Sequence, residues 1–229
     1  MQILQNLSLY FGSINNGSTQ KTSSKVSSGT SSYYSAGQTP ISGEPGVETM
    51  GLAVFNKDKL VGELNGFESI CHLIVSNKLK NAQIRVPSPI EELEYIDLYL
   101  EPNGSTKNSV SLVNDSPYIT VKVKLTAIMQ SMNENINLKD DDIVSKIETS
   151  AQNFLTEHIN NYLYKTSKEL HADIDSFGLY ALKYFYTKQE ADNYNWLSHY
   201  KDAFFDIDVQ VNLRSSYLLV NTSENKSEK

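Results

Sequence analysis

The sequence predicts an α+β fold, in which an antiparallel or mixed β-sheet packs against one long helix and two or three shorter helices. Residues 140–172 carry apolar side chains at three- and four-residue steps without Gly or Pro, which is the pattern of an amphipathic helix. Residues 118–129 and 204–213 alternate apolar and polar side chains, which is the pattern of strands with one buried face. The strands and helices follow one another in mixed order, and this favours α+β over a regular α/β alternation.

The helix expected over residues 140–172 is the longest element. At 1.5 Å per residue it would extend roughly 50 Å, so we expect it to lie across the whole sheet. Asp140, Asp141 and Asp142 occupy its first turn, where free N–H groups and the helix dipole favour negative charge. The turn at residues 173–175, or Gly178, is expected to end it. Its apolar stripe comprises Ile143, Ile147, Ala151, Phe154, Leu155, His158, Ile159, Tyr162, Leu163 and Leu170.

The remaining elements are shorter. Two apolar runs around a polar turn predict a hairpin over residues 50–64, and a second amphipathic helix follows from Phe67 to Leu79. A strand is expected at residues 82–87. Three further strands are expected at residues 95–100, 109–113 and 118–129, and we interpret these three as an antiparallel meander. Short helices are expected at residues 179–186 and 194–203, before the closing strand at 204–213.

Composition divides the chain into three parts. Residues 1–48 are rich in Ser, Gly and Thr, and we interpret them as a flexible segment. One interpretation of this segment is the remnant of a preceding domain. Tyr33 and Tyr34 interrupt this segment, either as an anchor to the body or as an exposed contact. Residues 49–220 are expected to form the α+β domain, and residues 221–229 a polar tail.

The totals exclude several classes of protein. A net charge of −7 argues against broad nucleic-acid binding, which needs a basic face. Cys71 is the single cysteine, so an intramolecular disulfide and a thiolate metal cluster are excluded, and its place on an apolar helix face indicates a small buried hydrophobe. The sequence has neither a signal-peptide pattern nor an apolar run of about 20 residues, so we expect a soluble chain.

No residue pattern predicts catalysis, a cofactor or a metal. We therefore expect no catalytic, no cofactor-binding and no metal-binding residues. Side chains at residues 140–142 point about 100° apart, which suits the helix dipole better than a cation. His158 is expected to be a hydrogen-bonded core residue, and Asp173 and Asp175 to cap the next helix rather than to act as paired carboxylates. The histidines form no metal-binding motif, and they are His72, His158, His171 and His199.

Aromatic side chains crowd the last third of the chain. One interpretation is a helix-on-sheet core with hydrated tyrosine hydroxyls, and the other is a contact surface, because tyrosine and tryptophan favour interfaces. The residues are Tyr180, Tyr184, Phe185, Tyr186, Tyr194, Trp196, Tyr200, Phe204 and Phe205.

Three segments in order carry a family resemblance over roughly residues 47–218. Residues 51–62 read G-L-A-V-F-N-K-D-K-L-V-G, residues 173–178 read D-I-D-S-F-G at the end of the long helix, and Trp196 opens a segment that leads into the closing strand. Together they resemble the C-terminal portion of the GerAC family, also written Ger(x)C, of spore germination proteins. The resemblance implies the C subunit of a nutrient germinant receptor, a protein of sporulation and germination in endospore-forming bacteria.

The resemblance also implies a non-enzymatic lipoprotein on the outer face of the spore inner membrane. Its partners would be two integral membrane subunits and the membrane itself, with no cofactor and no nucleic acid. The family's lipid-modified cysteine lies near the N-terminus, whereas Cys71 lies within a predicted helix, so we expect the anchor to be absent from this chain. The alternative is a secreted or surface ligand-binding or adhesive module, with residues 1–48 as a stalk.

Overall fold

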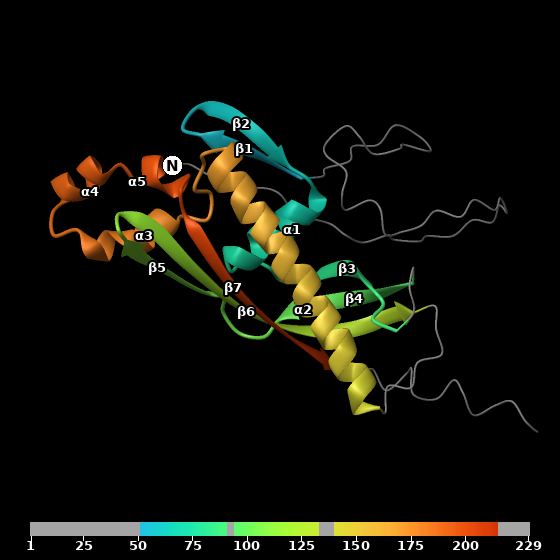
Figure 1. The fold of residues 1–229 in the computed structure, drawn as a ribbon. Helices are drawn as coiled ribbons and strands as arrows, with labels where there is room; N and C mark the ends of the chain where they lie inside the picture. Colours follow the sequence, from blue (N-terminus) through green and yellow to red (C-terminus); the bar gives the residue numbers. More distant parts are fainter. Residues whose placement is uncertain (1–50, 91–93, 133–139, 215–229) are drawn as a thin grey trace, which may run out of the picture.

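The computed structural model describes residues 51–90, 94–132 and 140–214. It confirms an α+β fold, in which a mixed sheet is covered by one long helix and several shorter ones (Figure 1). The strands are β1 Leu52–Asn56, β2 Lys59–Leu64, β3 Ala82–Pro87, β4 Tyr95–Pro102, β5 Lys107–Val113, β6 Ser116–Met132 and β7 Phe204–Arg214. The helices are α1 Gly66–Val75, α2 Asp141–Tyr164, α3 Phe177–Ala181, α4 Lys188–Tyr194 and α5 Trp196–Tyr200.

Strand β6 is the centre of the five-stranded sheet. Strand β7 runs parallel to it along one side, while β4 and β5 both pair antiparallel with it along the other side. The predicted meander is therefore wrong, because β5 pairs with the first half of β6 and β4 with the second half. Alternation of side chains determines which face of a strand is buried, and it carries no information about which strand lies beside it.

Helix α2 lies across the sheet and buries the stripe that the sequence predicts (Figure 1). Its side chains at Ile147, Ala151, Leu155 and Ile159 are fully buried. Helix α2 packs against β7 and β3. The same core contains the buried side chains of β6 and β7, which are Ile119, Val121, Val123, Leu125, Ala127, Val209 and Val211. Burying one such aliphatic side chain contributes about 1.5–3 kcal/mol, so this layer is the main source of stability.

The two ends of the long helix differ. Asp140 caps the first turn by accepting a hydrogen bond of 3.0 Å from the backbone N–H of Asp142, as the acidic start predicts. Regular α-helix ends at Tyr164, earlier than expected, and a π-helical turn at Lys165–Glu169 continues it. In this turn the hydroxyls of Thr166 and Ser167 donate to the Leu163 carbonyl at 3.0 and 2.8 Å, so side chains compete for the backbone acceptors of the helix.

The β1–β2 hairpin forms as predicted and packs on the π-helical turn. Gly51 has a φ of 81°, and a Cβ there would collide with the Leu64 carbonyl oxygen. A Cβ on Gly62 would collide with the side chain of Leu170, so this glycine allows the hairpin to approach the helix end. The two glycines of the 51–62 segment therefore have structural roles.

The short helices depart most from the prediction. Helix α1 ends at Val75, α3 is continued only by a 3₁₀ turn at Leu182–Tyr184, and α5 stops at Tyr200. Helix α4 was not predicted, because none of its residues is buried and it has no apolar period. Asn195, in the left-handed conformation, separates α4 from α5. Residues 1–48 and 221–229, with Tyr33 and Tyr34, lie outside the described residues.

Candidate interaction surface

Exposed apolar side chains gather at one end of the molecule. Eight of the 13 large apolar side chains that are exposed in the described residues lie on α3, its 3₁₀ turn, the bend that follows this turn and the neighbouring ends of β5, β6 and β7. They are Val113, Tyr118, Leu179, Tyr180, Leu182, Tyr184, Tyr186 and Phe204, and we call them the apolar end. Figure 1 shows the short C-terminal helices grouped beside β5. Exposed apolar side chains that gather in one region mark interaction sites in soluble proteins.

Two tyrosine hydroxyls attach this end to the sheet. Tyr184 donates to the Val110 carbonyl at 3.1 Å, and Tyr194 donates to the Asp115 carbonyl at 2.7 Å. Both rings thus lie over the β5–β6 hairpin with their polar tips satisfied by backbone.

The aromatic side chains divide between the two interpretations. Tyr200 is fully buried, and Phe185, Tyr194, Trp196 and Phe205 are partly buried, as in a helix-on-sheet core. The other four are exposed, and they are Tyr180, Tyr184, Tyr186 and Phe204, with Tyr186 at 97% exposure.

A buried polar network lies at the turn that precedes α3. The side chain of Asp175 has no solvent exposure, and it accepts hydrogen bonds from the Tyr162 hydroxyl at 2.7 Å and from His72 Nδ1 at 2.9 Å. Burial, with the Asp175 charge, raises the pKa of Tyr162 well above its usual value, so the hydroxyl keeps the proton that it donates. The network joins α1, α2 and the turn that precedes α3.

Asp173 fastens the short helices to one another. Its carboxylate accepts from the backbone N–H groups of Phe177 and Gly178 at 2.8 and 2.7 Å, and from Trp196 Nε1 at 2.8 Å. Burial raises its pKa from 3.8 to about 6, against the lowering effect of these donors. The predicted capping role is confirmed for Asp173 and wrong for Asp175, whose carboxylate turns inward to side chains instead.

Trp196 explains the glycine of the D-I-D-S-F-G segment. A Cβ on Gly178 would lie 2.9 Å from the indole ring, closer than real Cβ contacts allow. Glycine at this position lets the indole lie against the start of α3 and reach Asp173.

The other sequence-predicted residues have structural environments. Cys71 is fully buried, and burial raises the pKa of its thiol, which suits a small hydrophobe. His158 is half-buried and its Nδ1 donates to the Phe154 carbonyl at 2.8 Å, which confirms a hydrogen-bonded histidine. His171 makes the same type of bond to Ser167. In residues 51–90, 94–132 and 140–214, no three His, Cys, Asp or Glu side chains form a group that could hold a metal.

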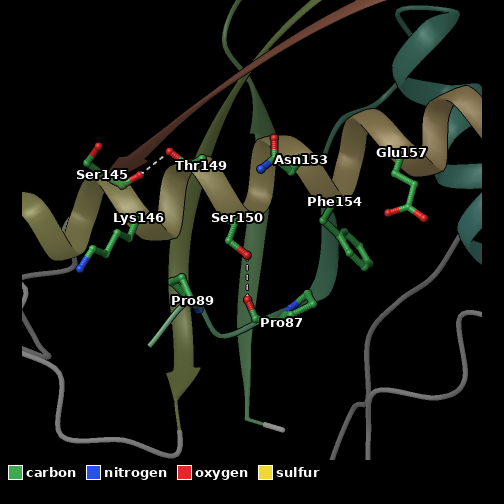
Figure 2. Close-up of a pocket in the computed structure, with 9 residues that line it drawn as sticks. All are labelled: Pro87, Pro89, Ser145, Lys146, Thr149, Ser150, Asn153, Phe154 and Glu157. Atoms are coloured by element: carbon green, nitrogen blue, oxygen red, sulfur yellow. Dashed lines mark hydrogen bonds between the residues drawn. The ribbon is translucent and has the colours of Figure 1, made fainter. Parts of the chain in front are cut away.

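A groove of about 500 Å³ lies between the outer face of α2 and the end of β3. Figure 2 shows Ser150 directed at Pro87, and its hydroxyl donates to that carbonyl at 2.8 Å. Thr149 donates to the Ser145 carbonyl at 2.8 Å, so these two hydroxyls are occupied by the protein's own backbone. A second hollow of about 460 Å³ is lined by Val113, Asn114, Ser116, Tyr118 and Phe204.

These features define an α+β domain whose unusual surface is an exposed apolar end. The profile of the family described as "Spore germination B3/ GerAC like, C-terminal" matches residues 50–217, and the chain belongs to this family. A search of curated proteins found no match.

A solved structure described as "Crystal Structure of the GerBC protein" is similar in fold. It superposes with a TM-score of 0.59 at 15% identity, over 71% of this chain and 50% of that chain. The chain thus spans about half the length of that protein, and at this identity the likeness shows the fold alone. Among the described residues, no helix combines the length and the apolar character that a membrane crossing requires.

Proposed function

We propose that this chain is a non-enzymatic subunit of a spore nutrient germinant receptor, acting in germination through protein–protein contacts at the spore inner membrane. The family match over residues 50–217 carries this proposal. As the C-type subunit, it would be a lipoprotein on the outer face of the inner membrane, beside integral membrane subunits. The lipid would attach outside Cys71, because that thiol is fully buried.

The arrangement of polar groups supports a role by contact. The buried carboxylates Asp173 and Asp175 are engaged by backbone, Trp196, Tyr162 and His72, and so they hold the fold together. The apolar end instead exposes Leu179, Leu182 and Tyr186 at 67%, 51% and 97%. Apolar and tyrosine side chains in one exposed area are what a docking surface requires.

Deletion of the gene tests the proposal. We expect spores to form in normal numbers and to lose their response to particular nutrients, measured as the fall in optical density after each nutrient is added. A wild-type copy should restore the response. Deletion spores that respond normally to every nutrient tested would refute the proposed function.

A surface variant then tests the mode of action. Leu182→Ser with Tyr186→Ser should weaken the nutrient response, because it makes the apolar end polar without touching buried residues. The matched control is Tyr95→Ser, which changes a tyrosine exposed to 51% on β4. Equal responses from the two variants, with equal protein levels in the spore, would contradict docking through the apolar end.

A further inference from the structure

One face of the sheet is open to solvent along β5, β6 and β7. Side chains of these strands alternate between the buried core and this face, which no described helix buries. We call it the open face. It carries Val113, Tyr118 and Phe204 at one end and Lys107, Lys122 and Lys124 further along.

An apolar hollow occupies one end of the open face. Tyr118 and Phe204 are partners in the β6–β7 register, and Val113 lies on the adjoining strand. Their exposures are 40%, 60% and 57%, and they line the hollow of about 460 Å³. The hollow is large enough to receive an apolar side chain from another molecule.

Positive charge outnumbers negative charge further along the same face, where Asp208 on β7 is the register partner of Lys122. Lys107 stands directly opposite Lys122 in the β5–β6 register, and Lys124 follows on β6 with the same orientation. Like charges directly opposite each other destabilise a sheet. The ion pairs found in the described residues join His72 to Asp175, Arg85 to Asp97 and Lys165 to Glu68, and so include none of these three lysines. An anionic partner would relieve this repulsion.

The distance between the apolar hollow and the lysines indicates how the matching groups of a partner would be spaced. Tyr118 and Lys122 are four residues apart on one strand, which is about 13 Å. The side chains between them are small and neutral, at Ser109, Ser111 and Thr120. A chain lying along β5 and β6 would meet first an apolar hollow, then a polar strip, then the lysines.

We propose that the open face binds a protein segment that places one apolar side chain in the hollow and carboxylates, about 13 Å away, on Lys107, Lys122 and Lys124. This inference rests on the proposed function, and it names the surface and the chemistry of one partner. A flat anionic bilayer fits less well, because Asp206 and Asp208 lie on β7 beside Thr120 and Lys122 in the register and would face the headgroups. A narrow segment that follows β5 and β6 lies over the three lysines and leaves Asp206 and Asp208 at its β7 edge.

Selection from a random peptide library displayed on phage, with the full purified chain as bait, tests the inference. We expect the enriched peptides to carry an aromatic or aliphatic residue about four positions from Asp or Glu. A synthetic peptide of that consensus should bind saturably in fluorescence anisotropy. Lys122→Glu with Lys124→Glu should lower its affinity at least about tenfold, and Val113→Asp should do the same by filling the hollow with charge.

The matched control is Lys59→Glu, which reverses an exposed lysine on the β1–β2 hairpin. It should leave the peptide affinity unchanged. The inference is overturned if no peptide is enriched, if the consensus lacks acidic residues, or if the control variant weakens binding as much as the lysine pair. It is also overturned if phosphatidylglycerol vesicles bind through Lys122 and Lys124 while peptides do not.

Spores separate this inference from the proposed function. If deletion of the gene abolishes the nutrient response but Lys122→Glu with Lys124→Glu leaves it intact at normal protein levels, the inference fails and the proposed function stands. If deletion has no effect, the proposed function fails whatever the peptide result.

Discussion

The two faces of the central sheet differ in whether their charged side chains are paired. On the side of α1 and α2, the carboxylate of Asp175 is fully buried and engaged by Tyr162 and His72, and nearby Lys165 pairs with Glu68 at 2.7 Å. On the open face, Lys107 and Lys122 stand opposite each other in no ion pair. The buried charges on the core side have partners within the chain, whereas the like charges of Lys107 and Lys122 stand opposite each other on the open face, with Asp208 beside Lys122 on β7.

This difference separates folding from docking. The carboxylates of Asp173 and Asp175, in the turn before α3, set the positions of α3 and α5. Their removal should therefore lower the free energy of unfolding. The open-face lysines contribute little to the fold, and their loss should be measured in binding. Variants at Asp175, Asp173, Gly51 and Lys107 test this separation.

Asp175→Ala should lower the free energy of unfolding by about 4 kcal/mol. The carboxylate accepts from the Tyr162 hydroxyl at 2.7 Å and from His72 Nδ1 at 2.9 Å, and each hydrogen bond to a charged group contributes about 1.5–3 kcal/mol. The contact of 3.1 Å between His72 Nδ1 and the Tyr162 hydroxyl would remain. Urea unfolding followed by tryptophan fluorescence measures the loss. Tyr162→Phe, which removes one hydroxyl and keeps the ring, should cost about 1 kcal/mol. Equal losses for the two variants would show that the carboxylate is not the centre of the network.

The pH dependence of stability should reveal Asp173. Its folded-state pKa of about 6 lies above the ordinary 3.8, so the folded protein binds the proton more tightly than the unfolded chain. Its contribution to stability is therefore full below pH 4 and is lost as pH rises through about 6.

Relative to Asp173→Asn, wild type should lose about 2 kcal/mol between pH 4 and pH 7. Urea unfolding of both proteins at each pH checks this, because groups other than Asp173 cancel in the difference. A difference that is constant with pH would mean that burial does not raise this pKa.

Gly51→Ala should destabilise the protein by about 2 kcal/mol more than Gly104→Ala. Both glycines have positive φ, 81° and 98°, so both variants bear the cost of that backbone conformation. Only at Gly51 would the new Cβ meet the Leu64 carbonyl, since nothing lies within 4 Å of the corresponding position at Gly104. The difference between their urea midpoints isolates the collision, and equal midpoints would show that the hairpin shifts to relieve it.

Local periodicity predicted much of this fold. The stripe on α2, the alternation on β6 and β7, and the β1–β2 hairpin were found because their side-chain spacing reflects burial. Strand order was predicted wrongly because β4 and β5 share β6 as a partner, and pairing between distant strands leaves no mark in the spacing. Helix α4 was missed because it buries nothing.

The site was less predictable than the fold. Asp175 was expected to cap a helix, and its true partners, His72 and Tyr162, lie 103 and 13 positions away along the chain. Tyr162 already stood on the apolar stripe of the long helix, and a hydroxyl on a buried stripe needs a buried acceptor, so that signal could have indicated a polar network. Nothing local in the sequence indicates that Lys107 faces Lys122, because this depends on the β5–β6 register.

The sign of the stability change at Lys107 tests whether the lysine pair is repulsive. Lys107→Glu would place opposite charges across the β5–β6 pair and should stabilise the isolated protein by about 0.5 kcal/mol. Lys107→Gln, which only removes the repulsion, should gain less, and salt should reduce both gains because the side chains are solvent-exposed. Differential scanning calorimetry at low and high salt measures the order of the three proteins. If Lys107→Glu destabilises the chain, the lysine pair contributes to the stability of the fold. The proposed difference between the two faces would then be wrong.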